Sequence, residues 1–114
     1  MLIFYHNPKC SKSREGLELL KKNGATFSIK DYLKEGLTEN EVFELSKLLG
    51  LIPEEFIRKK DEIYKDLKLS EKKLNTKEWC KIIAENPKLL ERPILSNGKK
   101  AIIGRPCENL LKLI

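Results

Sequence analysis

The sequence of 114 residues predicts an α/β fold with a mixed sheet, in which a β-α-β segment and a β-β-α segment flank an all-helical insertion. Three observations lead to this prediction. Short apolar runs near both ends have the length of buried strands. The middle of the chain has helix caps and helical periodicity. An Asn-Gly pair separates the last two apolar runs. We therefore expect a single domain over residues 1–114, with the helical insertion at about residues 38–90.

The first segment begins with the apolar run "LIFYH", which is typical of a buried strand. A helix then starts at Ser11 and stops at Asn23–Gly24, where glycine adopts the left-handed conformation that ends many helices. In "TFSIKD", Phe27 and Ile29 alternate with polar residues, as in a strand with one exposed face. The crossover helix makes the two strands parallel. Gly16 inside the helix predicts close packing against a neighbouring backbone.

The insertion begins with a capping box. Thr38 is the expected N-cap, Glu41 is its partner three residues later, and Gly50 ends this helix. Pro53 occupies a favourable first position for another helical segment. The same capping pattern, Asn-x-x-Glu, opens the helix "NTKEWCKIIAENP". Residues 38 to about 90 are therefore expected to be helical.

The last quarter returns to strands. The runs "RPIL" and "KKAII" flank Ser96-Asn97-Gly98, and an Asn-Gly turn between apolar runs is a strong signal for a β-hairpin. A short final helix is expected to start at Pro106. The third and fourth strands are therefore antiparallel neighbours.

Composition narrows the class of protein. The chain is 40% hydrophobic and 35% charged, and no apolar run approaches the roughly 20 residues that span a bilayer. The first ten residues lack the pattern of a signal peptide, so we expect a cytoplasmic protein that contacts no membrane. Three cysteines are too few for a disulfide framework.

The net charge of +6 favours anionic partners. The lysines are scattered and have no aromatic residues between them, so we predict no direct contact with nucleic acid.

Cys10 is the candidate for chemistry. It lies in "YHNPKCSKSR", and no acidic residue occurs from Met1 to Arg14. Zinc requires about four ligands, and the single histidine has no second cysteine nearby, so we predict no metal site. Ser13 stands where a C-x-x-C pair would have its second cysteine. A helix N-terminus with basic neighbours lowers the pKa of a thiol. Cys10 is therefore predicted to be a nucleophile, and the alternative is a small core residue.

Four motifs then point to a known family. The β-α-β and β-β-α order, with a cysteine after the first strand, is that of thioredoxin-like proteins. "YHNPKCSKSR", "FIRKK", "ERPIL" and "GRP" occur together, at positions 5–14, 56–60, 91–95 and 104–106. With these motifs the chain resembles the glutaredoxin-coupled arsenate reductases, a family that also contains the Spx-type regulators of RNA polymerase. The resemblance covers essentially the whole chain.

The resemblance implies roles for individual residues. Cys10 would be the catalytic thiolate, His6 would approach it or shuttle a proton, and Pro93 would be a cis-proline facing the cysteine. The residues expected to bind the oxyanion are Ser13, Arg14, Arg58, Arg92 and Arg105. A planar guanidinium suits a tetrahedral oxyanion better than the point charge of lysine does.

The resemblance also implies a reaction. The Cys10 thiolate attacks arsenate, glutathione attacks the adduct, and glutaredoxin reduces the resulting mixed disulfide. No tightly bound cofactor is expected, and glutathione is a co-substrate. Cys107, two residues after Arg105, is a further candidate as a resolving thiol.

Two alternatives to an arsenate reductase remain at this point. One is a regulator that binds the RNA polymerase alpha subunit, and the other is a glutathione-dependent thiol transferase without arsenate activity. Ser11 and Lys12 follow the cysteine where the well-understood arsenate reductases have Gly-Thr, which leaves the substrate open.

Overall fold

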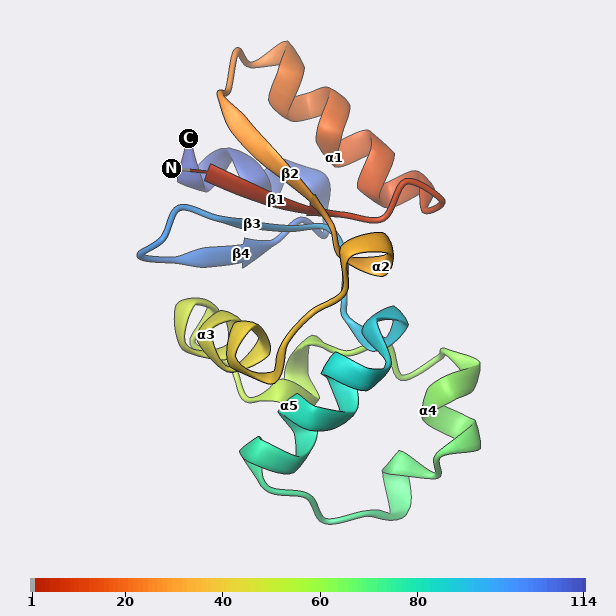
Figure 1. The fold of residues 1–114 in the computed structure, drawn as a ribbon. Helices are drawn as coiled ribbons and strands as arrows, with labels where there is room; N and C mark the ends of the chain where they lie inside the picture. The colour runs from red at the N-terminus through yellow and green to blue at the C-terminus, as the bar shows by residue number, and fades with distance from the viewer. Residues whose placement is uncertain (1) are drawn as a thin grey trace. The chain divides into compact units, whose positions relative to one another are not determined.

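A computed structural model describes residues 2–114 and divides the chain into two compact units. The first contains the residues up to 35 together with residues 92–114, and we call it the sheet unit. The second, residues 36–91, contains the helices of the expected insertion, and we call it the helical unit. The mixed α/β fold class is confirmed (Figure 1). That both units form a single domain stays a prediction.

The sheet unit is built around four strands in the order β2-β1-β3-β4. β1 is parallel to β2, whereas β3 is antiparallel to both β1 and β4, so the predicted crossover and hairpin are confirmed. The elements are β1 (Leu2–His6), α1 (Ser11–Lys22), β2 (Phe27–Asp31), α2 (Tyr32–Glu35), β3 (Ile94–Ser96), β4 (Ala101–Ile103) and η4 (Cys107–Leu113).

Helices α1 and η4 pack against each other and cover one face of this sheet (Figure 1). The core beneath them consists of fully buried Phe4, Leu20, Leu95 and Leu110. A Cβ atom placed on Gly16 of α1 would lie 2.9 Å from Leu110 Cδ1 and 3.0 Å from Pro93 Cγ. The predicted close packing at Gly16 is therefore present, but its neighbours are side chains rather than backbone.

Two details of the sheet unit differ from expectation. Ile29 is 48% exposed, although the alternating pattern of β2 predicts that its face is buried. The core beneath α1 and η4 reaches Phe27 of this strand but does not include Ile29, so the Ile29 side chain stays open to solvent. The final helix, η4, is a 3₁₀ helix that begins after Pro106 rather than an α-helix.

The helical unit contains α3 (Glu39–Leu49), η1 (Pro53–Phe56), α4 (Glu62–Asp66), η2 (Leu69–Glu71), α5 (Thr76–Glu85) and η3 (Pro87–Leu89). The capping box at Thr38 is formed, since the Glu41 N–H donates to Thr38 Oγ1 at 3.1 Å and the Thr38 N–H donates to Glu41 Oε1 at 3.0 Å. α5 has the same arrangement, and Gly50 ends α3 with a φ of 68°. Pro53 starts only a short 3₁₀ helix. In residues 2–114, no helix is long and apolar enough to cross a membrane.

Candidate active site

The loop between β1 and α1 places Cys10 at the N-cap of α1. Cys10 has the extended conformation typical of an N-cap, with φ −98° and ψ 125°. Its N–H donates to the Asn7 carbonyl at 3.0 Å, and its carbonyl accepts the Arg14 N–H at 3.1 Å, the first bond of the helix. The half-buried thiol therefore lies where the first main-chain N–H groups of α1 have no partner inside the helix.

Those N–H groups stabilise the thiolate. Burial raises the pKa of Cys10, but hydrogen bonds from the main-chain N–H groups of Ser13 and Lys12, and from the Arg92 side chain, lower it. The charge of Arg92 acts in the same direction, and the pKa lies below the ordinary value for a thiol. A larger fraction of Cys10 is therefore ionised at neutral pH than of a free cysteine.

Ser13 and His6 form a buried pair beside this loop. Ser13 is fully buried, and its Oγ lies 2.7 Å from His6 Nδ1 and accepts the Asn7 N–H at 2.9 Å. We infer that the hydroxyl proton is shared with Nδ1, which leaves the imidazole proton on Nε2. Burial lowers the pKa of His6, and Asp31 opposes this only in part, so the neutral imidazole dominates at neutral pH. Ser13 thus contacts the Cys10 thiol through its main-chain N–H. Its hydroxyl instead bonds to His6 and to the Asn7 N–H in the loop before Cys10.

The predicted arginines of the sheet unit occupy three positions near the ends of strands and helices. Arg92 is hydrogen-bonded to the Cys10 thiol, as described above. Arg105 Nε donates to the Arg92 carbonyl at 2.8 Å, and Arg14 Nη1 donates to the Pro8 carbonyl at 2.8 Å. Arg14 and Arg105 are thereby attached to the two loops that lead into the site. Their part in oxyanion binding stays a prediction.

Two cis peptide bonds follow the arginines Arg92 and Arg105. The bond between Arg92 and Pro93 is cis, which is the geometry that the resemblance implies for Pro93. The bond between Arg105 and Pro106 is cis as well, which the sequence did not reveal. Pro93 also packs directly against α1 at Gly16, so the segment with Arg92 contacts the helix that begins at Cys10.

Arg58 belongs to the helical unit. Its Nη1 atom forms an ion pair with Asp61 Oδ2 at 3.2 Å, and its N–H donates to the Leu89 carbonyl at 2.7 Å. Because Asp61 also caps α4 through the Ile63 N–H, this part of the chain has a defined local shape. The role of Arg58 toward an oxyanion stays a prediction.

Cys107 differs from Cys10 although both are in the sheet unit. It lines a hollow of about 200 Å³ together with Lys12 and Arg105. Its Sγ lies 3.7 Å from Glu108 Oε1. Burial and the neighbouring Glu108 carboxylate raise the pKa of Cys107. The thiol is therefore mainly protonated at neutral pH, and it is a poorer nucleophile than Cys10. All three cysteines are free in the described chain.

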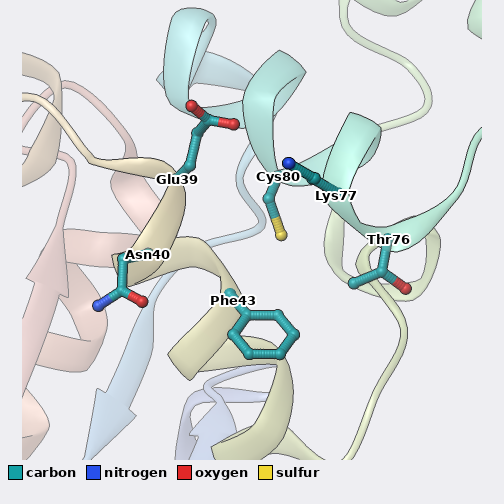
Figure 2. Close-up of a pocket in the computed structure, with 6 residues that line it drawn as sticks. All are labelled: Glu39, Asn40, Phe43, Thr76, Lys77 and Cys80. Atoms are coloured by element: carbon teal, nitrogen blue, oxygen red, sulfur yellow. The ribbon is translucent and has the colours of Figure 1, made fainter.

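Cys80 lines a cavity in the helical unit. The cavity has a volume of about 530 Å³, and Figure 2 shows the Cys80 sulfur directed from α5 into the space beside the Phe43 ring of α3. Burial raises the pKa of Cys80, and the charge of Glu39 adds to this effect. Cys80 is 3% exposed, and so is its neighbour Trp79, so both belong to the core of the helical unit. A protonated thiol in an apolar cavity has no feature of a nucleophile.

Asn7 is the residue at this site that sequence reasoning missed. Its main chain bonds to Cys10 and Ser13, and its side-chain Oδ1 accepts the Lys9 N–H at 3.0 Å. The Asn-Pro pair predicts only the end of a strand. The sequence nevertheless contained a signal for this turn, because an asparagine side chain commonly accepts a hydrogen bond from the main-chain N–H two residues later. Residues 2–114 contain no cluster of three or more His, Cys, Asp or Glu side chains arranged to hold a metal ion.

Comparison with known proteins identifies the family. The model of the ArsC family matches residues 5–113. The chain belongs to the ArsC family. The family and the thioredoxin-like fold expected from the motifs are thus confirmed.

Relatives in this family share almost the full length of the chain. An arsenate reductase of Haemophilus influenzae is 45% identical over 99% of this chain and 98% of its own. An arsenate reductase of Escherichia coli is 30% identical over 99% of this chain and 80% of its own. The solved structure of an arsenate reductase from Vibrio cholerae is 41% identical, with a TM-score of 0.93, over 99% of this chain and 97% of that one.

Proposed function

We propose that this ArsC-family enzyme reduces arsenate to arsenite through the thiolate of Cys10. The observation that carries the proposal is the environment of the Cys10 thiol, where two main-chain N–H groups of α1 and the guanidinium of Arg92 lower the pKa. A nucleophile and positive charge occur together there, and arsenate chemistry requires both. The arsenate reductases among the relatives support the choice of substrate.

The same groups would bind the oxyanion. The N-terminus of α1 presents main-chain N–H groups, which favour anions at this end of a helix. Arg92 adds a fixed cation at the thiol, and Arg14 and Arg105 are the other arginines of the sheet unit expected from the sequence. Phosphate and sulfate have the same tetrahedral shape. Arsenate is distinguished from them by its reaction with a thiolate, not by its binding.

The reaction would proceed in two covalent steps. The Cys10 thiolate forms a bond to arsenic, and one arsenate oxygen leaves as water after taking up two protons. A second thiolate then attacks the Cys10 sulfur, and the electron pair of the broken S–As bond stays on arsenic. Arsenic(V) thereby becomes arsenic(III) and leaves as arsenite, while the two sulfurs form a disulfide. We assign the buried pair of His6 and Ser13 a part in moving a proton, because the Ser13 hydroxyl lies 2.7 Å from Nδ1 of the neutral imidazole.

The second thiol would come from another molecule. Cys107 is mainly protonated, and Ser13 stands in place of a second cysteine after Cys10. We therefore propose glutathione as the attacking thiol and glutaredoxin as the reductant of the mixed disulfide, in the reducing cytoplasm. No intramolecular disulfide is needed for turnover.

A coupled assay tests this proposal. Arsenate, glutathione, glutaredoxin and an NADPH-linked reductase are combined, and arsenate-dependent oxidation of NADPH is followed. Cys10→Ser should abolish the signal, whereas Cys80→Ser, which alters a cysteine of the helical unit, should retain it. Equal rates for wild type and Cys10→Ser would contradict the proposal. Turnover of a glutathionylated peptide without any arsenate-dependent oxidation would instead identify a thiol transferase. Specific binding to the RNA polymerase alpha subunit without any turnover would identify a regulator.

A further inference from the structure

Asn7 lies at the centre of the loop that presents the cysteine. It is 8% exposed and takes part in three hydrogen bonds within six residues of chain. Its carbonyl accepts the Cys10 N–H at 3.0 Å, its Oδ1 accepts the Lys9 N–H at 3.0 Å, and its N–H donates to Ser13 Oγ at 2.9 Å. No other residue of this loop connects the strand end to both the cysteine and the helix in the described structure.

We propose that Asn7 is a positioning residue that holds Cys10 at the N-cap of α1, within reach of the first main-chain N–H groups of the helix. Asn7 has no contact with the sulfur and acts through the main chain. The expected effect of Asn7 on arsenate turnover rests on the proposed function. The expected effect of Asn7 on the reactivity of the Cys10 thiol does not, because it is measured without arsenate.

Each of the three bonds limits one freedom of the loop. The bond from Lys9 closes a turn of the kind that asparagine side chains commonly stabilise. The bond from Cys10 fixes the direction in which the main chain enters the helix. The bond to Ser13 attaches the loop to the first turn of α1, and His6 Nδ1 holds the same hydroxyl from β1. Only the turn bond depends on the amide side chain. Substitution of Asn7 therefore loosens the turn before Cys10, while the two bonds of the Asn7 main chain can still form and the backbone of α1 persists.

The position of Cys10 matters because its ionisation depends on short contacts. The N–H groups of Ser13 and Lys12 lower the pKa only while the sulfur stays at the helix N-terminus. The effect of a helix end falls off within about one turn. A loop that relaxes by a small distance therefore loses much of this stabilisation, while burial continues to raise the pKa.

Asn97 provides a matched control. Its Oδ1 accepts the Lys99 N–H at 2.9 Å and the Lys100 N–H at 2.7 Å, in a turn of the same kind within the same unit. The β3–β4 hairpin that contains Asn97 lies at the end of the sheet where β1 begins, since Ser96 pairs with Ile3. Cys10 follows the opposite end of β1. Asn97→Ala therefore removes a comparable turn without reaching the thiol.

The test measures alkylation of Cys10 by iodoacetamide as a function of pH in Asn7→Ala, Asn7→Ser and Asn97→Ala. Asn7→Ala should react about fivefold more slowly than wild type at pH 7 and reach the same rate at high pH, because only the ionised fraction changes. Asn7→Ser should recover part of the rate, since a hydroxyl supports the same turn more weakly. Asn97→Ala should match wild type.

The outcomes separate positioning from general stability. A wild-type pH profile in Asn7→Ala, or an equal shift in Asn97→Ala, would overturn the proposal. If Asn7→Ala does not fold, amide hydrogen exchange in the wild-type protein decides the question: slow exchange of the Lys9 and Cys10 N–H groups is expected, and unprotected exchange refutes the role. In the arsenate assay, kcat/KM of Asn7→Ala should fall in parallel with the alkylation rate. If wild type has no arsenate activity, the alkylation result still stands by itself.

Discussion

The two units each place a cysteine on a helix, but the two thiols differ in their chemistry. Cys10 is the N-cap of α1, where the following N–H groups are available to its sulfur. Cys80 lies within α5, where N–H groups are bonded along the helix. Burial raises the pKa of both thiols, and only Cys10 has donors that outweigh it. Position relative to the helix end therefore decides which cysteine is a nucleophile.

The units also differ in charge. The sheet unit has twelve lysines and arginines against five carboxylates, a net charge of +7. The helical unit has eleven against twelve, a net charge of −1. The overall charge of +6 thus comes from the unit that contains Cys10. An anionic substrate is attracted to that unit, and the charge supports the proposed oxyanion chemistry.

The largest effect is expected from the cation at the Cys10 thiol. Arg92→Ala should lower kcat/KM for arsenate about a hundredfold, because it removes a donor to the thiolate and a cation for the oxyanion. Steady-state kinetics with Lys99→Ala as control test this, since Lys99 is an exposed cation of the same unit. A loss of similar size in both variants would mean that overall charge, not the contact, is responsible.

A second experiment compares the three cysteines directly. At pH 7, Cys10 should be alkylated at least about tenfold faster than Cys80 and Cys107. The sign follows from the pKa directions: the pKa of Cys10 is lowered, so its rate rises at a lower pH than that of a free thiol. The pKa values of the other two are raised, so their rates rise only at higher pH. Mass spectrometry after limited labelling measures all three, and equal labelling would contradict the contrast.

The packing of α1 on the sheet unit predicts a loss of stability. Gly16→Ala should lower the free energy of unfolding by about 1–3 kcal/mol, because the new methyl group would overlap Leu110, Pro93 and Phe4. Glu18→Ala on the exposed side of the same helix is the control and should change little. Urea denaturation measures both. If Gly16→Ala left the free energy of unfolding unchanged, the Leu110 and Pro93 side chains would be able to move aside at little cost.

The smallest effect concerns the field of the sheet unit. Raising the ionic strength from about 50 to 200 mM should lower kcat/KM for arsenate about twofold to threefold, because salt screens the attraction between the +7 unit and the anion. Alkylation of Cys10 by neutral iodoacetamide is the control reaction and should depend less on salt. If both reactions depended equally on salt, the salt would be changing the reactivity of the Cys10 thiol rather than the attraction between the sheet unit and the anionic substrate.

Much of the fold follows from local patterns. The capping boxes at Thr38 and Asn75, the stop at Gly50 and the hairpin at Asn97 each depend on residues within a few positions, and all are present. The exposure of Ile29 was missed because the alternating pattern does not reveal how far along β2 the packed core extends. The 3₁₀ form of η4 was missed because helical patterns alone do not separate the two helix types.

The sequence alone was enough to place Cys10 at a helix N-terminus and to identify the family, and both are confirmed. Both depend on residue type and spacing, which are visible along the chain. The set of residues proposed to bind the oxyanion stays a prediction. Only the tertiary structure decided that the Ser13 hydroxyl bonds to His6 and Asn7, that Arg105 attaches to the Arg92 carbonyl, and that Asn7 accepts the N–H groups of Lys9 and Cys10. The physical reason is that a side chain bonds to whatever donor or acceptor folding brings within about 3 Å, and that partner is set by packing rather than by spacing in sequence.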